Sequence, residues 1–243
     1  MQNRNREALS RTELLLGNEA IERLGNARVI IFGIGGVGGY ALEALVRSGI
    51  GSITAVDSDT VSVSNINRQI IATEKTVGRL KVEVAGERAR EINPDVSFTS
   101  LPIFYSEETE SEINLSDYDY VIDAIDTVTS KIRLILNATS AGVPIISSMG
   151  AGNKLDPTAF KVADIYETSV CPLARVMRTE LRKRGVKSLK CVYSEEAPAR
   201  TSIEEGENGR KIRRAPASIA TIPSVVGLII ASEVIKDISK INK

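Results

Sequence analysis

Short apolar runs recur along the first 150 residues, and longer segments with helical spacing of apolar positions separate them. The first two runs are RVIIF, from Arg28 to Phe32, and SITAVD, from Ser52 to Asp57; VSFTSL, DYVIDAID and VPIISS follow. Continuously apolar runs are typical of parallel strands covered on both faces. The pattern therefore predicts an α/β fold with a Rossmann-like, mostly parallel sheet covered by helices.

The segments between these runs predict helices. An amphipathic N-terminal helix is expected to begin at Ser10 or Asn18 and to end at Gly25, with apolar positions at Leu14, Leu15, Leu16, Ile21 and Leu24. Three further helices are expected at Val37 to Ser48, Lys75 to Ile92 and Ser130 to Ala141. Asn93-Pro94 is expected to stop the second of these, because the residue before a proline avoids helical backbone.

Beyond residue 150 the alternation of apolar runs and helical segments becomes less regular. FKVADI and KCVYS are expected to be short strands on either side of a basic helix from Pro172 to Arg184. Residues 195–216 are polar and are expected to form a mobile loop, and the apolar segment from Ala217 to Ile238 is expected to be a core helix. We therefore expect a core at residues 1–150 and a smaller α/β C-terminal extension at residues 151–243, packed on the same domain.

Composition narrows the chemistry. The 243 residues contain 31 Lys and Arg and 31 Asp and Glu, so there is no net charge to attract polyanions. There is no histidine, and the two cysteines, Cys171 and Cys191, lack the CxxC spacing of a zinc site. We expect no zinc, and we assign neither cysteine a catalytic role. No apolar run reaches the roughly 20 residues that span a bilayer, and the N-terminus lacks a signal-peptide pattern, so we expect a cytoplasmic protein without membrane contact.

Gly33, Gly35 and Gly38 form a GxGxxG motif directly after a strand and before a helix. Backbone N–H groups and the positive end of the helix can approach a phosphate at such a turn. Asp57 follows Gly38 at close to the spacing of about 20 residues expected for an acid that binds a ribose. These features predict a nucleotide with a ribose; the alternative is a tight turn in a fold that binds no nucleotide.

The residues after Asp57 separate the classes of nucleotide enzyme. Arg68 and Lys81 can stabilise the charge that builds on a leaving pyrophosphate, which a dinucleotide dehydrogenase does not need. Asp126 ends the run DYVIDAID, which is expected to be a strand, so it lies at the sheet edge where ligands bind, and its carboxylate can bind Mg²⁺. Each of these residues alone is weak evidence, since a single Lys or Arg on a helix is usually solvated surface. Together they favour an enzyme that activates carboxylates with ATP.

The segments GIGGVGG, VDSDTVSVSNINRQ, GRLKVE and VIDAID resemble the adenylation domain of the ubiquitin-activating-enzyme superfamily, the group that includes ThiF, MoeB and HesA. The resemblance covers about residues 10–148 and implies that the core binds and uses ATP. It implies catalytic roles for Asp126, which is linked to Mg²⁺, and for Arg68 and Lys81. The implied contacts to the nucleotide come from Gly33, Gly35, Gly36, Gly38, Asp57, Asp59, Asn65, Arg68, Gln69 and Lys81. Arg11 matches an arginine that family dimers place at the partner's ATP, so the resemblance also implies a homodimer.

Departures from the superfamily pattern select a subfamily. Members that activate a small ubiquitin-like protein usually carry two CxxC pairs, which are absent here, and the usual Asp-Asn pair is Asp126-Thr127. The segments KVADIYETSVCPLARVMRTELRKRG and KCVYSEE resemble the tRNA threonylcarbamoyladenosine dehydratases, the TcdA or CsdL family. This resemblance implies that ATP activates the carboxylate of threonylcarbamoyladenosine in tRNA and that a ring closes with loss of water. It leaves open a monovalent cation, Na⁺ or K⁺, and a cysteine-desulfurase or sulfur-acceptor partner.

Basic residues gather in two segments of the otherwise neutral chain, which suggests a local site for a polyanion such as tRNA. The first segment contains Arg175, Arg178, Arg182, Lys183, Arg184, Lys187 and Lys190, and the second contains Arg210, Lys211, Arg213 and Arg214. The alternative for the first segment is a solvated helix face.

Three other function classes remain open. An activator of a small sulfur-carrier protein would share the adenylating half, although the missing CxxC pairs and the basic segments argue against it. An NAD-dependent oxidoreductase is supported by GxGxxG and Asp57 alone. A non-catalytic scaffold would leave Asp126, Arg68 and Lys81 without a role.

Overall fold

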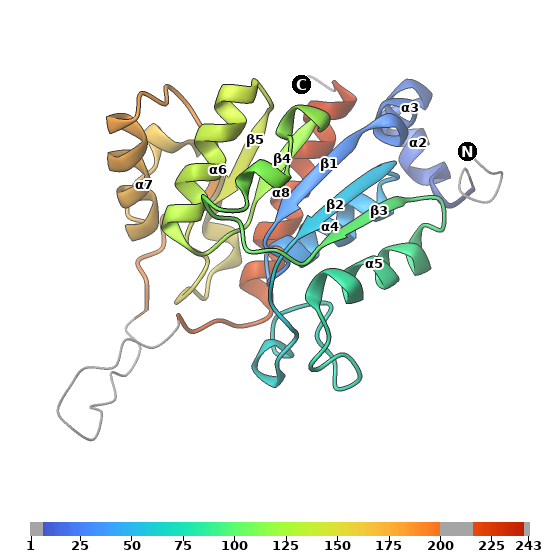
Figure 1. Cartoon of the computed structure of the whole chain (residues 1–243), viewed down its shortest axis with the longest axis horizontal. Coiled ribbons are helices and arrows are strands. Elements are labelled where there is room, and N and C mark those ends of the chain that lie inside the picture. The colour runs from blue at the N-terminus through green and yellow to red at the C-terminus, as the bar shows by residue number, and fades with distance from the viewer. Residues whose placement is uncertain (1–6, 200–215, 241–243) are drawn as a thin grey trace.

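The computed structural model describes residues 7–199 and 216–240 of the chain. Within these residues, seven strands form one sheet in the order β3-β2-β1-β4-β5-β7-β6 (Figure 1). Neighbouring strands run parallel except for β6, which pairs antiparallel with β7. The strands are β1 (Arg28–Phe32), β2 (Ser52–Val56), β3 (Ser97–Leu101), β4 (Tyr120–Asp123), β5 (Ile145–Ser148), β6 (Phe160–Asp164) and β7 (Lys190–Ser194). The predicted α/β class and mostly parallel sheet are confirmed.

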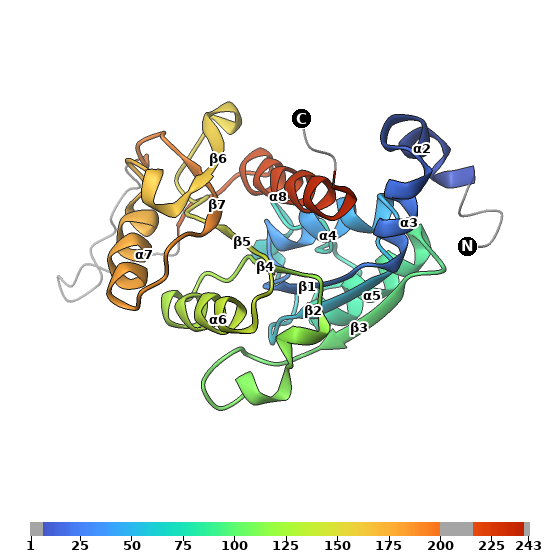
Figure 2. The same cartoon turned by 90° about the horizontal axis from the view of Figure 1, so that it is seen from above.

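Helices cover both faces of the sheet (Figure 2). On one face α4, α5 and α8 pack together, and on the other α6 and α7 share a cluster of buried apolar side chains with β7. The helices are α2 (Ser10–Leu16), α3 (Asn18–Asn26), α4 (Gly38–Arg47), α5 (Lys81–Ile92), α6 (Val128–Ala141), α7 (Pro172–Lys183) and α8 (Thr221–Ser239). Short 3-10 turns lie at η1 (Val63–Asn65), η2 (Glu110–Glu112), η3 (Leu115–Asp117), η4 (Pro157–Ala159) and η5 (Ile165–Glu167).

The C-terminal helix α8 packs against the start of the chain. Val226, Ile230 and Val234 on α8 are fully buried. Gly227 lies so close to α4 that a Cβ atom there would stand 2.3 Å from the backbone oxygen of Val37. The strands β7 and β6 likewise extend the same sheet beyond β5, so residues after 150 complete the layers begun by the first half.

Three predicted boundaries are wrong. The single N-terminal helix is two helices, because Gly17 adopts a φ of 85° between them. The helix expected from Lys75 begins at Lys81, whose backbone N–H donates to the backbone oxygen of Asp59. The strand expected to run through Asp126 ends at Asp123.

None of the described helices is long and apolar enough to cross a membrane. Of the predicted loop at 195–216, residues 200–215 lie outside the described residues, together with Arg210, Lys211, Arg213 and Arg214.

Candidate functional site

The carboxyl ends of β1, β2 and β4 lie side by side and carry the turn of Gly33, the acid Asp57 and the loop that holds Asp126. In open parallel sheets, ligands bind outside this edge. Most of the predicted nucleotide contacts therefore meet at one place.

The glycines of the first turn are required by close packing. Gly33 has a φ of 90°, and a Cβ atom there would lie 2.6 Å from the backbone oxygen of Ala124. A Cβ atom on Gly38 would lie 1.8 Å from the backbone oxygen of Gly33. Gly36 is covered from α8, where Pro223 would stand 2.9 Å from an added Cβ. Only glycine allows the start of α4 to fold this tightly against β1.

The two acids after β2 have different partners. Asp57 accepts hydrogen bonds from the backbone N–H of Ile34 at 2.7 Å and of Asp59 at 2.8 Å, so its carboxylate holds the glycine turn. Asp59 is two-thirds exposed and accepts from the Lys81 ammonium at 2.7 Å, which lies 3.6 Å from Asp57. Lys81 is itself buried. The turn, both acids and the lysine thus form one connected polar unit.

The Asn-Arg-Gln run lies in a turn that begins at η1. Asn65 accepts from the backbone N–H of Ser62 at 3.0 Å, and its backbone oxygen accepts from the N–H groups of Arg68 and Gln69. The Arg68 guanidinium donates to the backbone oxygen of Ser64 at 2.7 Å and to the side chain of Asn67 at 2.9 Å. These contacts hold the run in a fixed turn.

Gln69 is the member of this run that fits a ligand best. Its side chain is 7% exposed, and its Oε1 is the one buried side-chain oxygen or nitrogen without a hydrogen-bond partner in the described part of the chain. A Cβ atom on Gly35 would lie 3.9 Å from its Nε2, so the amide faces the glycine turn. A buried acceptor without a donor costs free energy, and a nucleotide hydroxyl or amine would satisfy it.

Asp126 lies in the loop between β4 and α6 and is exposed. It accepts from the hydroxyl of Thr127 at 3.3 Å. Among the described residues, no group of three acidic, Cys or His side chains is arranged to hold a metal ion. Mg²⁺ that is bound through nucleotide phosphates needs only one or two protein carboxylates, so Asp126 is chemically suited to that arrangement.

Arg11 does not join this site within one chain. It lies on α2, which sits near the beginning of β1 and far from the Gly33 turn (Figure 1). Arg11 is exposed, and so are its neighbours Leu14 and Leu15, at 88% and 83%. In the described part of the chain, α2 has no buried residue.

Several residues of the predicted basic surface already make hydrogen bonds, ring contacts or ion pairs with other residues of the protein. Arg178 donates to the backbone oxygen of Thr168, and the Arg182 guanidinium lies 5.0 Å from the centre of the Tyr166 ring. Lys183 and Arg184 both pair with Glu180. Arg175 and Lys187 are exposed.

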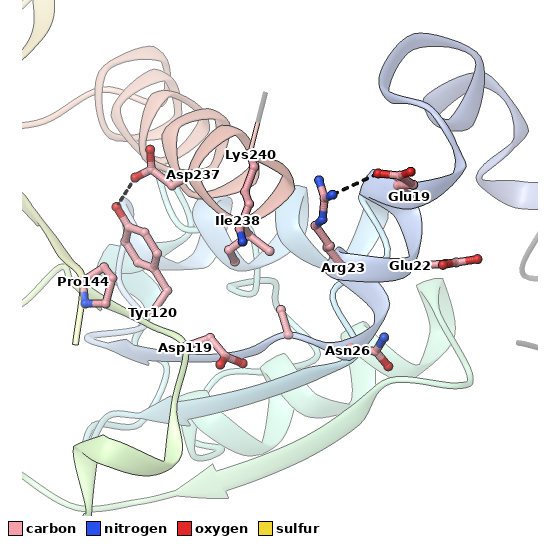
Figure 3. Close-up of a pocket in the computed structure, with 11 residues that line it drawn as sticks. Glu19, Glu22, Arg23, Asn26, Asp119, Tyr120, Pro144, Asp237, Ile238 and Lys240 are labelled. Carbon is pink, nitrogen blue, oxygen red and sulfur yellow. Dashed lines mark hydrogen bonds and ion pairs between the residues drawn. The ribbon is translucent and has the colours of Figure 1, made fainter. Parts of the chain in front are cut away.

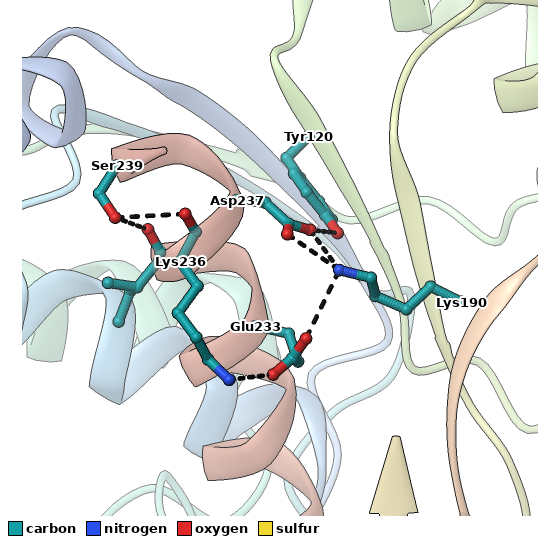
Figure 4. A network of polar contacts seen from close by, with 7 residues as sticks. Tyr120, Lys190, Glu233, Lys236, Asp237 and Ser239 are labelled. Carbon is teal, nitrogen blue, oxygen red and sulfur yellow. Dashed lines mark hydrogen bonds and ion pairs between the residues drawn. The ribbon is translucent and has the colours of Figure 1, made fainter. Parts of the chain in front are cut away.

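Lys190 belongs to a separate polar network (Figure 4). Its ammonium lies 2.7 Å from the Asp237 carboxylate and 3.5 Å from that of Glu233, and Tyr120 donates to Asp237 at 2.6 Å. Burial, together with the bond to Asp237, raises the pKa of Tyr120. This network fixes α8 to β4 and β7.

Both cysteines are buried and free. Burial is the main reason that the pKa of the Cys191 thiol is raised to about 12, so at neutral pH it is a thiol and not a thiolate. A neutral, buried thiol is a poor nucleophile.

A cavity of about 630 Å³ lies at the amino ends of the strands, on the opposite edge from Gly33 (Figure 3). Arg23 and Asp237 project toward it, and each is bound to a neighbour: Arg23 to Glu19 at 3.0 Å and Asp237 to Tyr120. This cavity is therefore separate from the nucleotide-type turn.

Sequence reasoning missed three residues that shape the site: Asp123 and Lys131, which form a buried ion pair under the Asp126 loop, and Pro223, which covers Gly36. A signal for the pair was present, because an acid inside the apolar run DYVID needs a buried partner. Pro223 gave no local signal.

The chain resembles known proteins over nearly its whole length. It is 45% identical over 239 residues to the tRNA threonylcarbamoyladenosine dehydratase of Bacillus subtilis (strain 168), covering 95% of this chain and 94% of that protein. The crystal structure of the E. coli enzyme TcdA in complex with AMP superimposes with a TM-score of 0.87 at 33% identity, covering 97% of this chain and 95% of that one. The same enzyme in complex with ATP gives a TM-score of 0.84. The sequence model of the ThiF family matches residues 9–243, and the chain therefore belongs to the ThiF family.

Proposed function

We propose that this protein is an ATP-dependent enzyme that adenylates the carboxylate of threonylcarbamoyladenosine in tRNA and promotes ring closure with loss of water. The observation that carries the proposal is the full-length likeness to a dehydratase of that name, in a chain whose nucleotide-type turn and acidic loop share one sheet edge. The relatives solved with ATP and AMP support the choice of nucleotide.

The proposed reaction has two steps. A carboxylate oxygen of the substrate attacks the α-phosphorus of ATP, and pyrophosphate leaves. A nitrogen or oxygen of the same modified nucleoside then attacks the acyl-adenylate carbon, and AMP leaves with the original carboxylate oxygen. The net change is the loss of one water from the nucleoside. Because the second step is intramolecular, it gains a large rate advantage and needs no nucleophile from the protein.

Each polar residue of the edge has a role in the first step. Lys81 and Arg68 stabilise the negative charge that develops on the leaving pyrophosphate. Asp57 keeps the glycine turn in shape for the phosphates, and Gln69 accepts a hydrogen bond from the nucleotide. Asp126 would hold Mg²⁺, which would supply stabilisation of negative charge on the phosphates. Asp59 and Asn65 hold Lys81 and the Arg68 turn.

The protein acts as a homodimer in this proposal. The exposed Leu14 and Leu15 on α2 are the kind of apolar surface that a partner buries, and Arg11 on the same helix would then reach the partner's ATP. The tRNA contacts the basic surface around α7, where Arg175 and Lys187 are exposed. A monovalent cation and a sulfur-transfer partner remain predictions.

The deciding experiment incubates the purified protein with ATP, Mg²⁺ and tRNA that carries threonylcarbamoyladenosine, followed by gentle digestion and mass spectrometry. The expected result is a nucleoside lighter by one water, formed together with AMP and pyrophosphate. ATP binding without any change in the nucleoside would overturn the proposed acceptor. Pyrophosphate exchange with a small sulfur-carrier protein in place of tRNA would then favour the alternative activator.

A further inference from the structure

Asp123 and Lys131 form an ion pair in the interior, where β4 ends beneath the first turns of α6. The Lys131 ammonium lies 2.8 Å from Oδ2 of Asp123, and both side chains are 0% exposed. Ser147, on the neighbouring strand β5, donates to the same carboxylate oxygen at 2.5 Å. A charged pair therefore occupies a place that apolar side chains fill elsewhere in the sheet.

Such a pair is not explained by stability. Removing two charges from water costs about as much as their attraction returns, and apolar side chains of similar size often stabilise a fold better. Lys131 points into the layer between sheet and α6 that also contains Leu134 and Ile135, both fully buried. Since stability does not account for the pair, we ask which part of the backbone it holds in one conformation.

The pair holds the segment that carries Asp126. The second oxygen of Asp123 accepts a hydrogen bond from the backbone N–H of Ile125 at 3.2 Å. At the other end, the backbone N–H of Lys131 donates to the backbone oxygen of Thr127 at 3.0 Å. The ion pair thus joins the two ends of the loop, and Asp126 lies between them.

The same loop rests against the glycine turn. The backbone N–H of Ala124 donates to the backbone oxygen of Phe32 at 2.9 Å, and Ala124 touches the position that a Cβ atom on Gly33 would occupy. A shift of the loop would therefore move Asp126 relative to the turn that approaches the phosphates. Misplacement by about 1 Å is enough to cost a large part of an enzyme's rate.

We propose that Asp123 and Lys131 are positioning residues, whose buried ion pair fixes the loop geometry that brings Asp126 to the metal-bound phosphates. This inference rests on the proposed function, because it gives Asp126 its role in adenylation. Neither residue touches the substrate: both act through the backbone of residues 124–127.

The test replaces the pair by two leucines, Asp123→Leu with Lys131→Leu. This variant removes both charges and the acceptor for Ile125, while it leaves no unpaired charge in the core. We expect a folded protein whose kcat for water loss from the substrate tRNA falls about 10- to 100-fold, with a KM for ATP within about threefold of wild type. A second pair, Asp123→Asn with Lys131→Met, keeps an uncharged acceptor for Ile125 and should lose about threefold in kcat.

A control removes a different ion pair, the partly buried one between Glu43 and Arg88, which joins α4 and α5 at 2.7 Å. The variant Glu43→Gln with Arg88→Met should lower the melting temperature and leave kcat unchanged. The decisive measurement compares kcat of Asp126→Asn with kcat of a triple variant that combines Asp126→Asn with the two leucine substitutions. Because the pair acts through Asp126, no further loss beyond about twofold is expected there.

Two results would overturn the inference: a leucine pair that folds and has wild-type kcat, or an equal loss with and without Asp126→Asn. If the leucine variant does not fold, the same comparison is made with Asp123→Asn and Lys131→Met. A wild-type kcat in that variant rejects the positioning role. A wild-type protein that shows no water loss would reject the proposed function instead, so the two failures are distinguishable.

Discussion

The two edges of the sheet differ in how their polar groups are satisfied. The amino edge has the cavity of about 630 Å³, yet Asp237, Tyr120 and Lys190 beside it are bonded to one another. The carboxyl edge instead holds the left-handed Gly33, the buried unpartnered oxygen of Gln69 and the exposed Asp126. The comparison teaches that a cavity alone does not mark the candidate site: a buried polar atom without a hydrogen-bond partner lies at the other edge of the sheet.

The largest effect is expected from Asp126→Ala at the carboxyl edge. If Asp126 holds Mg²⁺ as proposed, its loss should reduce water loss from the substrate tRNA by at least about 100-fold, because charge on the phosphates is no longer stabilised. The melting temperature should not change, since the side chain is exposed. Mass spectrometry of the nucleoside and a thermal melt measure both, and ATP consumption at the wild-type rate would refute the assigned role.

Gln69→Leu tests the unpartnered acceptor. The variant should weaken ATP binding about tenfold, which calorimetry can measure. Without nucleotide it should be more stable than wild type by about 1 kcal/mol, because a buried polar group without a partner is removed. An unchanged Kd for ATP would show that Gln69 is a core residue and would weaken the contrast between the edges.

Reversing two charges on α7 tests the tRNA surface. Arg182→Glu with Lys183→Glu should weaken tRNA binding several-fold at low salt and leave the Kd for ATP unchanged. The matched control, Lys236→Glu on α8 with Lys240→Glu directly after it, changes the net charge equally but lies at the amino edge, so it should preserve tRNA affinity. Equal tRNA affinity in both variants would favour the alternative that α7 presents a solvated helix face and does not contact tRNA.

Lys190→Met tests the amino edge as a structural network. Both Lys190 and Asp237 are about one-third exposed, so solvent screening limits the loss of stability to less than about 1 kcal/mol. Neither tRNA affinity nor turnover should change. A loss of tRNA affinity in this variant, measured by filter binding, would instead assign Lys190 to the basic surface.

The smallest effect concerns acid stability, through Glu43 at the contact of α4 and α5. Burial raises the pKa of this carboxyl, but the hydrogen bonds of Arg88 and Arg47 outweigh burial and hold the pKa below its ordinary value. The resulting stabilisation is complete above the unfolded pKa of about 4.3 and is lost as pH falls through the lower folded pKa. The stability difference between wild type and Glu43→Gln should therefore shrink between about pH 5 and pH 3, and a constant difference in urea melts would contradict it.

Local patterns were enough to predict most of the sheet. Runs such as RVIIF and KCVYS form β1 and β7 at the expected residues, and the helix from Pro172 ends within one residue of its expected end. The errors occurred where the local signal was ambiguous. Gly17 splits the N-terminal helix, which apolar spacing alone does not reveal, and the chain before Lys81 is held as a turn through the bridge of Thr60 with Leu80.

The sequence by itself determined the α/β class, the glycine turn and the residue types of the candidate site, because short-range periodicity and spacing encode strands, helices and turns. Only the tertiary structure decided which residues from distant parts of the sequence lie in contact. It joined Asp57 to the glycine turn, Pro223 to Gly36 and Lys131 to Asp123, and it separated Lys190 from α7 by pairing it with Asp237. Those outcomes depend on burial and on contacts between distant segments, where the free energy of a charge is set by its surroundings and not by its neighbours in the chain.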